Sequence, residues 1–343
     1  MYTCYEDGFF KELWCGFWRR VGVEERFKHM GCRRVLVTGG AGFIGSHLVD
    51  SLLSKGFDVV VLDDLSTGRF ENIKSHLNEE SFRFIQGDIR DREVLRKALD
   101  GVDAVFHLAA ITSVPYSVEH PDITFEVNVG GTRVLLESCL DFNVGRFVYV
   151  STSAVYGDPK YLPIDEDHPT EPISPYGESK LEAEELCLRF YKDYGLDVTV
   201  FRLFNVYGLR QRNDQYGGVI ARFIERLSSG KPPVIYGDGS QTRDFIYVGD
   251  VVKAFIRSLY REGLSGKVLN VATGNPTSIR ELAYTLMRLF GAEGMEPLYR
   301  DAREGDIEHS YADISEAKNH LGFVPEVSLK EGLLELINNS LGK

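Results

Sequence analysis

The feature that most constrains the fold of this chain is the glycine-rich segment TGGAGFIGSHL, residues 38–48. A short β-branched run, residues 33–39, precedes it and is predicted to be a buried strand. The apolar spacing of residues 43–56 predicts a helix that ends at Gly56. Glycine permits a tight turn between the two elements and lets backbone N–H groups approach a ligand, while the helix N-terminus adds partial positive charge. The segment therefore predicts a site for a dinucleotide pyrophosphate.

Further strand-like runs follow, with helical stretches between most of them: residues 57–63, 82–88, 103–110, 146–151 and 198–204. Strands that alternate with helices predict an α/β fold with a parallel, doubly wound sheet of the Rossmann type. Runs such as VVVL lack polar alternation, as expected for strands that are buried on both faces. After Asn205 the regular alternation of strands and helices ends, and loops rich in glycine and proline interrupt short helices. We therefore expect a smaller C-terminal domain that closes over the sheet.

Composition excludes several classes of protein. The formal net charge of −12 disfavours a nucleic-acid surface or an anionic membrane surface as a partner. No window of about 20 apolar residues is present that would span a bilayer. The five cysteines lie far apart, without the spacing of a zinc site or a disulfide framework. We therefore expect no metal site and a reduced, cytoplasmic location.

Acidic and small residues follow successive predicted strands. Asp63 ends the run 57–63, where a carboxylate accepts both ribose hydroxyls of a dinucleotide and repels a 2′-phosphate. This favours NAD over NADP as the cofactor, and the alternative is a structural turn followed by an ordinary acidic cap. Asp88 follows the next strand, where it is either a partner of the adenine amine or a helix cap. Ala109 and Ala110 are small where the cofactor backbone would pass.

A catalytic pair is predicted at Tyr176 and Lys180, which form Tyr-x-x-x-Lys in SPYGESKLEAEEL. Four residues apart on a helix, their side chains share one face. A phenol is ordinarily too weak a base at neutral pH, but a neighbouring ammonium and a positively charged nicotinamide both lower its pKa. Lys180 can also hold the nicotinamide ribose. Thr152, just past the fifth strand, can complete a proton relay to Tyr176, or it can simply satisfy strand-end backbone groups.

These motifs resemble one family, the extended short-chain dehydrogenases/reductases that modify sugar nucleotides. The motifs TGGAGFIGSH, HLAA, SxxxVYG, YGESK and GDGSQTRDFIYVGDV carry the resemblance, which covers nearly everything from residue 33 onward. Within the family the chain is most similar to UDP-glucose 4-epimerases and to relatives that accept N-acetylhexosamines. The resemblance implies Thr152, Tyr176 and Lys180 as catalytic residues. It implies NAD contacts, besides Tyr176 and Lys180, from Gly39, Gly42, Phe43, Ile44, Gly45, Asp63, Asp64, Ser66, Thr67, Asp88, Ile89, Leu108, Ala109, Ala110 and Asn128.

The resemblance also implies a substrate site for a UDP-sugar. Its residues would be Ser113, Thr152, Asn205, Val219, Val234, Tyr236, Arg243, Arg303, Asp306 and Ser310. Arg243 and Arg303 make physical sense independently, because a pyrophosphate needs guanidinium groups in a chain that is otherwise so acidic. Taken alone, either arginine would more often be a surface ion-pair partner.

At two sites this chain departs from the residue pattern of the family it resembles, and both departures narrow the expected activity. Related dehydratases and decarboxylases carry acidic residues between the threonine and VYG, where this chain has Ser153 and Ala154. No acid is then available to expel water, which disfavours a dehydratase. Ser310 occupies the position of the family's bulky sugar-pocket gate. A small side chain there leaves room for an N-acetyl group, or it merely lines a wide pocket that still prefers glucose and galactose.

The predicted domain division follows from the motifs and from the end of the strand–helix alternation after Asn205. Residues 32–205 would form an NAD-binding Rossmann domain, to which residues 242–273 return, and residues 206–241 and 274–343 a nucleotide-sugar-binding domain. Residues 1–31 alternate aromatic and charged side chains and lack the apolar run of a signal peptide. They either precede a true start at Met30 or form an amphipathic appendage.

We therefore expect NAD-dependent 4-epimerisation of a UDP-hexose, UDP-glucose/UDP-galactose or the N-acetyl forms, as in galactose metabolism. Alternatives are an epimerase of UDP-glucuronate or of a GDP- or dTDP-sugar, a dehydratase, an oxidoreductase that releases NADH, and a non-catalytic NAD-binding protein. An intact Tyr-x-x-x-Lys pair argues against the last. The resemblance also implies a homodimer formed through helices at about 119–141 and 176–194, although those apolar faces could equally be core.

Overall fold

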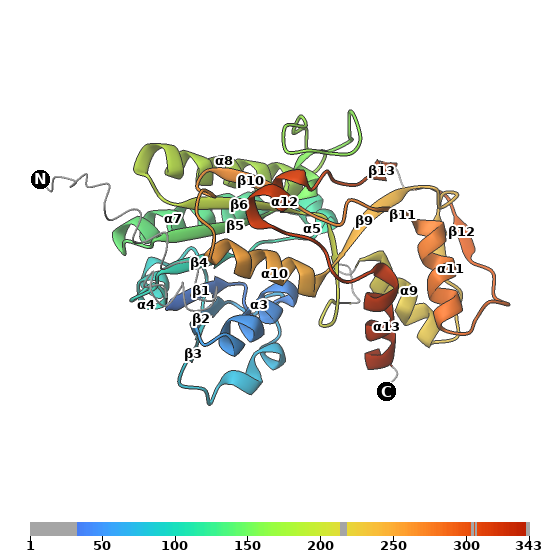
Figure 1. Cartoon of the computed structure of the whole chain (residues 1–343), viewed down its shortest axis with the longest axis horizontal. Helices are drawn as coiled ribbons and strands as arrows, with labels where there is room; N and C mark the ends of the chain where they lie inside the picture. The colour runs from blue at the N-terminus through green and yellow to red at the C-terminus, as the bar shows by residue number, and fades with distance from the viewer. Residues whose placement is uncertain (1–32, 213–217, 303–304, 306, 341–343) are drawn as a thin grey trace, which may run out of the picture.

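A seven-stranded parallel sheet forms the centre of the fold (Figure 1). The computed structural model describes residues 33–212, 218–302, 305 and 307–340. The strand order is β10-β6-β5-β4-β1-β2-β3, and every neighbouring pair is parallel. The predicted doubly wound α/β fold is confirmed. The strands are β1 (Arg34–Thr38), β2 (Asp58–Asp63), β3 (Phe82–Gln86), β4 (Ala104–His107), β5 (Arg146–Thr152), β6 (Val198–Leu203) and β10 (Lys267–Val271).

Helices cover both faces of this sheet, which explains why its strands are continuously apolar. α3 (Phe43–Ser54) and α10 (Val248–Leu259) pack on one face, as Figure 1 shows. α4 (Arg92–Ala98), α7 (Thr132–Asp141) and α8 (Pro175–Tyr194) pack on the other. Alternate side chains of β1 therefore enter different cores: Val35 and Val37 face α3, and Leu36 faces α4 and α7.

The strand order reverses between β1 and β4, because the chain runs from β1 to β2 and β3 on one side and then crosses to β4 on the other. At such a switch point the loops after neighbouring strands leave in opposite directions and open a crevice at the carboxyl ends of the strands. The glycine-rich loop after β1 and residues 108–112 after β4 lie on the two sides of this reversal.

The connection between β4 and β5 is helical but not continuous. The predicted helix over 119–141 consists of α6 (Pro121–Phe125), the π-helical turn η3 (Glu126–Gly131) and α7, with α5 (Val114–Glu119) before them. A π turn inserts a residue into the helical repeat and redirects the side chains that follow. Short 3₁₀ turns are η1 (Phe70–Asn72), η2 (Lys74–His76) and η4 (Ser153–Val155).

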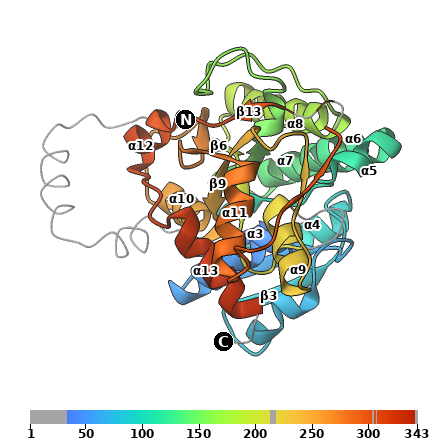
Figure 2. The same cartoon turned by 90° about the vertical axis from the view of Figure 1, so that its right-hand side faces the viewer.

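Most of the chain after β6 forms a second lobe, at the right of Figure 1 and facing the viewer in Figure 2. It contains a four-stranded sheet, in which β9 (Thr242–Tyr247) pairs with β7 (Asn205–Tyr207), β11 (Pro276–Ser278) and β13 (His309–Ser310). A two-stranded sheet joins β8 (Val234–Tyr236) to β12 (Leu298–Arg300). Its helices are α9 (Val219–Ser228), α11 (Ile279–Leu289) and α13 (Leu329–Ser340), which share a separate apolar core.

Residues 242–273 contribute to both lobes. β10 pairs with β6 in the large sheet, and α10 packs on α3, whereas β9 belongs to the small sheet. α12 (Ser315–Leu321) also returns to pack against β10. The division of the chain into two functional domains stays a prediction. So does any role for residues 1–31, which lie outside the described residues. No helix of the described chain is long and apolar enough to cross a membrane.

Candidate active site

A cavity of about 650 Å³ lies at the carboxyl ends of the parallel strands, beside the reversal of strand order. Strands β1 to β6 all contribute to its lining, directly or through the residues that follow them. The predicted cofactor and catalytic residues found in this lining are Gly39, Gly42, Phe43, Ile44, Gly45, Asp63, Asp64, Ser66, Thr67, Asp88, Ile89, Leu108, Ala109, Ala110, Thr152, Tyr176 and Lys180.

The glycine-rich loop is closely packed at one wall of the cavity. Gly39 has φ +70°, and a Cβ there would lie 2.8 Å from the backbone nitrogen of Ala109. A Cβ on Gly45 would lie 2.2 Å from the carbonyl oxygen of Gly39. α3 begins directly after Gly42, with no side chain capping its N-terminus and no acidic residue in its first turn. The first N–H groups and the positive end of the helix dipole are thus left for an anion such as a pyrophosphate.

Asp63, the last residue of β2, is almost completely buried beside this loop. Its Oδ2 accepts a hydrogen bond from the Ala41 N–H at 3.0 Å, and its Oδ1 accepts one from the Leu65 N–H at 2.9 Å. Burial raises the pKa of this carboxyl group, and the two backbone donors oppose the shift. Each oxygen retains a further lone pair, so the carboxylate can still accept the ribose hydroxyls expected of it.

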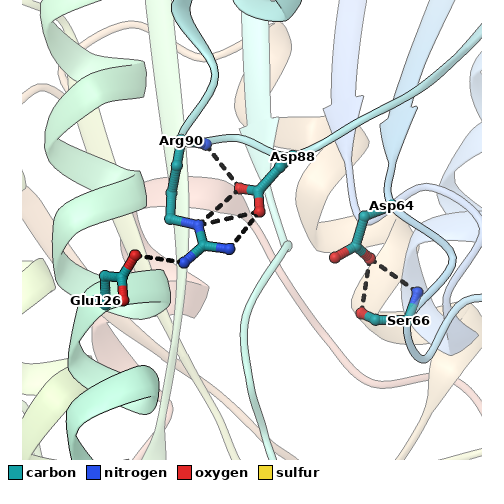
Figure 3. Close-up of polar contacts among 5 residues, drawn as sticks. All are labelled: Asp64, Ser66, Asp88, Arg90 and Glu126. Atoms are coloured by element: carbon teal, nitrogen blue, oxygen red, sulfur yellow. Dashed lines mark hydrogen bonds and ion pairs between the residues drawn. The ribbon is translucent and has the colours of Figure 1, made fainter.

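Asp88 follows β3 and is held by Arg90 rather than serving as a helix cap (Figure 3). The Arg90 guanidinium contacts both Asp88 oxygens, with the shortest distance 2.5 Å, and also donates to Glu126 Oε1 at 2.6 Å. This hydrogen bonding lowers the pKa of Asp88. The cap of α4 is Asp91, whose Oδ1 accepts from two backbone N–H groups. An adenine amine at Asp88 would therefore share the carboxylate with Arg90, whose planar guanidinium also lines the cavity.

A second acidic group lies across this end of the cavity. Asp64 Oδ1 accepts from the backbone N–H and the hydroxyl of Ser66, at 2.9 and 2.6 Å (Figure 3). The next residue, Thr67, accepts a hydrogen bond from Arg212 through its carbonyl oxygen at 3.0 Å. Arg212 follows β7 in sequence, so this contact joins the loop after β2 to the start of the second lobe.

The three predicted catalytic residues converge at the other end of the cavity. Thr152 is the last residue of β5, not the residue beyond it, and its Oγ1 accepts from the Ala154 N–H at 3.2 Å. The Thr152 side chain is also hydrogen-bonded to Tyr176. Tyr176 and Lys180 lie on α8, which begins at Pro175 after a Ser174 cap. The hydroxyl of Thr152 thus takes part in both the structural and the relay contacts proposed for it.

The charges of this pair differ from the sequence-based expectation. Burial raises the pKa of Tyr176, a shift that the Thr152 hydrogen bond opposes. Lys180 is only 4% exposed, its ammonium lies 4.2 Å from the centroid of the Tyr149 ring, and burial lowers its pKa to about 7. The expected phenolate is therefore not favoured by the protein alone. The positive charge of a bound nicotinamide is needed to lower the pKa of Tyr176.

Two predicted ligand contacts between β4 and β5, Asn128 and Ser113, lie outside the cavity lining. Asn128 is buried in the π turn, where its amide accepts from the Ile111 N–H at 2.8 Å and donates to the Ile111 carbonyl at 3.0 Å. It also donates to Ser179 on α8 at 2.9 Å. Ser113 is buried as the N-cap of α5 and accepts from the Tyr116 N–H. Both residues support the wall: Ile111 and Tyr116 line the cavity in their place.

The predicted substrate residues other than Thr152 and Ser113 belong to the second lobe or to its first strand. Arg243 and Ser310 are register partners in β9 and β13. Asn205 begins β7, opposite Phe245 of β9. Val219 begins α9, and Val234 and Tyr236 are the two ends of β8. None of these six lines the 650 Å³ cavity described above. Arg303 and Asp306 lie outside the described residues.

Several lining residues were not predicted. Gly87 and Arg90 flank Asp88, and Thr112 and Tyr116 follow Ala110 closely, so these four had a predicted residue nearby in the sequence. Leu203 and Phe204 end the predicted strand 198–204. Others come from segments that only the fold brings to the cavity: Arg69, Asn72, Ile123, Val127, Val206, Arg210 and Gln211. Among the described residues no group of His, Cys, Asp and Glu side chains has the arrangement of a metal site.

The residues present suit NAD. The cavity volume is within the range of cofactor sites. The uncapped α3 N-terminus suits the pyrophosphate, Asp63 suits an unphosphorylated ribose, and Lys180 and Tyr176 stand where a reactive ring would meet a second substrate. The arrangement can therefore bind a dinucleotide and move a proton through Thr152 and Tyr176.

Comparison with known proteins gives sequence relatives over almost the whole chain. Residues 35–272 match the profile described as NAD dependent epimerase/dehydratase family. A UDP-glucose 4-epimerase of Mycolicibacterium smegmatis is 43% identical over 307 residues, which cover 89% of this chain and 97% of that protein. A UDP-glucuronate 4-epimerase of Thermodesulfobacterium geofontis is 38% identical over 312 residues, which cover 88% of this chain and 94% of that protein.

Solved structures are similar over the same length. A UDP-glucose 4-epimerase from Thermotoga maritima with UDP-glucose has a TM-score of 0.84 and 39% identity, covering 90% of this chain and all of that one (100%). A UDP-N-acetylglucosamine 4-epimerase from Methanobrevibacter ruminantium, in complex with UDP-N-acetylmuramic acid, has a TM-score of 0.86 and 38% identity. The match covers 90% of this chain and 98% of that one. A UDP-glucose 4-epimerase from Thermus thermophilus in complex with NAD has a TM-score of 0.80 and 37% identity. The match covers 90% of this chain and 99% of that one.

Proposed function

Because the chain belongs to the NAD dependent epimerase/dehydratase family, we propose that it catalyses the 4-epimerisation of a UDP-hexose through a transient 4-keto sugar. The membership confirms the resemblance drawn from the glycine-rich and Tyr-x-x-x-Lys motifs. The protein is an enzyme of the nucleotide-sugar epimerase type, an isomerase, and its cofactor is NAD.

One observation carries the proposal: Thr152, Tyr176 and Lys180 meet in the same cavity as the glycine-rich loop and Asp63. A base, its hydroxyl partner and an ammonium are thus held beside a dinucleotide site. The absence of acidic residues at Ser153 and Ala154 supports epimerisation over dehydration, because no carboxyl group follows Thr152 in η4 to protonate a leaving hydroxyl.

The proposed chemistry assigns each of these side chains a step. The cofactor, when bound, supplies reversible hydride acceptance at C4 of the sugar. The Tyr176 phenolate takes the proton of the sugar 4-hydroxyl, aided by the hydroxyl of Thr152, and returns it after the ring has turned. Lys180 holds the nicotinamide ribose and favours the phenolate by its charge. The same base thus serves both directions, and no proton needs to be exchanged with solvent.

Inversion requires that the keto sugar present its other face within the site. We propose that affinity for the substrate resides in the UDP, held by the second lobe, so that weak contacts leave the ring free to rotate. The family pattern assigns this task to Asn205, Val219, Val234, Tyr236 and Arg243 among the described residues, and to Arg303 and Asp306. Ser310 would line the sugar pocket instead. Thr152 would contact the sugar itself, whereas Ser113, buried as the N-cap of α5, supports the cavity wall.

The choice of sugar is the finer part of the proposal. Relatives named for UDP-glucose, UDP-glucuronate and UDP-N-acetylglucosamine are all similar to this chain. We favour UDP-glucose and UDP-galactose, with the N-acetyl forms admitted by the small side chain of Ser310, and place the enzyme in galactose metabolism in the cytoplasm. UDP-glucuronate is the second candidate, and a GDP- or dTDP-sugar the third.

We also propose that the protein acts as a homodimer. Exposed apolar side chains on and beside the α5–α8 layer support this, including Val114, Val118 and Ile173. Sedimentation of the purified protein at micromolar concentration would test it. A monomer under these conditions would refute the proposal without affecting the assignment of the active site.

The test of function is to incubate the purified protein with UDP-galactose and, in parallel, with UDP-N-acetylgalactosamine and UDP-glucuronate, and to follow the anomeric protons by NMR. Appearance of the C4 epimer in the first two incubations, without accumulation of NADH, is the expected result. Turnover of UDP-glucuronate alone would move the assignment to the uronates. If none of the three sugar nucleotides is converted, with or without added NAD, the proposed function is overturned.

A further inference from the structure

A buried ion pair lies directly behind the active site. Glu184 on α8 is 2% exposed and Arg202 on β6 is 6% exposed. Arg202 Nη2 lies 2.5 Å from Glu184 Oε1, and its Nε contacts both carboxylate oxygens at 3.2 Å. Isolating two charges from water costs several kcal/mol per ion, so a buried pair is weak evidence of a stabilising role. Its position in the fold suggests another role.

Glu184 connects to the catalytic residues in two ways. Its Oε2 accepts a hydrogen bond from the hydroxyl of Ser151 at 2.8 Å, and Ser151 lines the cavity immediately before Thr152. Glu184 also stands one helical turn after Lys180, so that the two side chains share a face of α8. The carboxylate therefore lies behind both the strand and the helix that carry the catalytic groups.

The surroundings of Lys180 contain little else that is charged. The groups that face it are Tyr176, Glu184 and Cys187 on its own helix, Tyr149 on β5, and His107 on β4, with Arg202 on β6 behind Glu184. Burial raises the pKa of the Cys187 thiol and of Tyr149, and lowers that of His107 to about 3, so these groups are neutral near pH 7. Among the described residues, no carboxylate forms a direct ion pair with Lys180. Glu184 is thus the anion whose field opposes its desolvation.

We propose that Glu184 and Arg202 are a positioning pair that sets the electrostatic potential at Tyr176 and Lys180. Glu184 favours the ammonium of Lys180, and Arg202 limits this effect so that the phenolate of Tyr176 is not disfavoured. The inference rests on the proposed function, since it assigns Tyr176 and Lys180 to proton transfer.

The two partners have opposite effects on the site, which separates this role from a structural one. Glu184→Gln keeps an oxygen for Ser151 but leaves the charge of Arg202 uncompensated, so every nearby group loses its proton more readily. Arg202→Gln leaves the charge of Glu184 uncompensated, so nearby groups hold their protons more firmly. If the pair served only packing, both variants would destabilise the protein without moving the pH dependence in opposite directions.

The experiment is the pH profile of kcat for the holoenzyme with UDP-galactose, or with whichever sugar nucleotide it turns over. We expect the profile of Glu184→Gln to move about one pH unit to lower pH, and that of Arg202→Gln about one unit to higher pH. The double variant, which restores neutrality, should return close to the wild-type profile. If one single variant fails to fold, the direction of the shift in the other still tests the inference.

The Arg146–Asp197 pair provides a control of the same chemical type at the opposite end of the sheet. Arg146 begins β5, Asp197 directly precedes β6, and the two side chains lie 2.9 Å apart. Arg146→Gln and Asp197→Asn should reduce stability and leave the profile in place. A second readout does not depend on turnover: tyrosinate absorbance is titrated in each variant, and the same titration of a Tyr176→Phe background is subtracted. The titration of Tyr176 should move in the same directions as the profile.

Profiles that stay within about a tenth of a pH unit, or that move in the same direction for both partners, would overturn the inference while activity is retained. If the wild-type enzyme turns over no sugar nucleotide, the proposed function has failed. The tyrosinate titration then still tests the electrostatic role by itself.

Discussion

The side-chain amide of Asn128 donates a hydrogen bond to the hydroxyl of Ser179 at 2.9 Å. This bond joins the π turn of the β4–β5 connection to the helix that carries Tyr176 and Lys180, one residue before the lysine. The same amide makes two bonds to the backbone of Ile111 in the cavity wall. Asn128 therefore fixes the cavity wall relative to the catalytic helix, without itself reaching the cavity.

Replacing Asn128 with alanine should damage both stability and catalysis. The change leaves buried partners unsatisfied at three bonds, at about 1 kcal/mol each, so the free energy of unfolding should fall by about 3 kcal/mol. Urea unfolding and kcat at saturating NAD measure the two effects. The control is Ser138→Ala on α7, a buried hydroxyl that bonds only the Val134 carbonyl of its own helix. An Asn128 variant no weaker than this control would contradict the assigned role.

Gly45→Ala should prevent NAD binding. The new Cβ would lie 2.2 Å from the carbonyl oxygen of Gly39, so the backbone of the loop has to move away from the pyrophosphate position. Overpacking of this kind costs about 1–3 kcal/mol. Fluorescence titration with NADH measures the affinity, which should fall by at least about tenfold. Gly130→Ala, in the π turn with no heavy atom within 4 Å of its Cβ, should leave affinity unchanged.

Much of the site was predictable because its motifs are local in the sequence. Gly39 to Gly45 and Asp63 occupy strand ends, and parallel strands bring their carboxyl ends to one edge whatever the details of the loops. Tyr176 and Lys180 share a helical face by spacing alone. These residues could therefore be assigned before the fold was known.

The remainder depends on contacts between distant segments. Arg210 and Gln211 reach the cavity because Arg210 forms an ion pair with Asp50 of α3 and the Leu209 carbonyl is bonded to His47 of the same helix. Nothing in their local sequence indicates this. The π turn likewise could not be predicted, since one inserted residue barely alters a helical pattern of apolar residues. The effect of burial, which raises the pKa of Tyr176 in the protein without cofactor, could not be predicted either, because spacing does not reveal burial.

Asp63→Asn should weaken NAD binding and relax the discrimination against NADP. The amide oxygen can replace only one of the two acceptor atoms that now hold Ala41 and Leu65, and the charge that repels a 2′-phosphate is removed. We expect the dissociation constant for NAD to rise about tenfold while that for NADP rises less or falls. Asp58→Asn, at the opposite end of β2, is the control and should change neither constant. If the ratio of the NAD and NADP dissociation constants is the same in Asp63→Asn as in the wild type, Asp63 has no role in cofactor choice.

Tyr176→Phe should abolish epimerisation and leave NAD bound. The variant removes the hydroxyl that Thr152 contacts, and loss of a general base costs about 10²–10⁴ in rate. Turnover by NMR and the NAD content of the purified protein measure the two outcomes. Tyr161→Phe, which loses an exposed hydroxyl bound to Asp165, should behave as wild type. Residual activity above a few per cent in Tyr176→Phe would exclude this residue as the base.

His107 should make stability depend on pH below about 6.5. The ring is fully buried, with Nδ1 2.7 Å from Thr38 Oγ1 and Nε2 2.9 Å from Thr132 Oγ1. Thr132 donates its own hydroxyl hydrogen to the Asn128 carbonyl, so it accepts from Nε2–H, and Nδ1 is left to accept from Thr38. The ring is therefore neutral, and burial lowers its pKa from 6.5 to about 3.

Between these two values the unfolded chain binds a proton that the folded chain does not. The contribution of His107 to stability is therefore fully present above about pH 6.5 and is lost as the pH falls, by about 1.4 kcal/mol per unit. From about pH 7 to about pH 5 the wild type should lose about 2 kcal/mol more than His107→Gln in urea unfolding. His309→Gln, a partly exposed control, should behave as wild type. Equal losses in the wild type and His107→Gln would mean that the ring is protonated in the folded protein, and the hydrogen-bond assignment at Thr38 would have to be reversed.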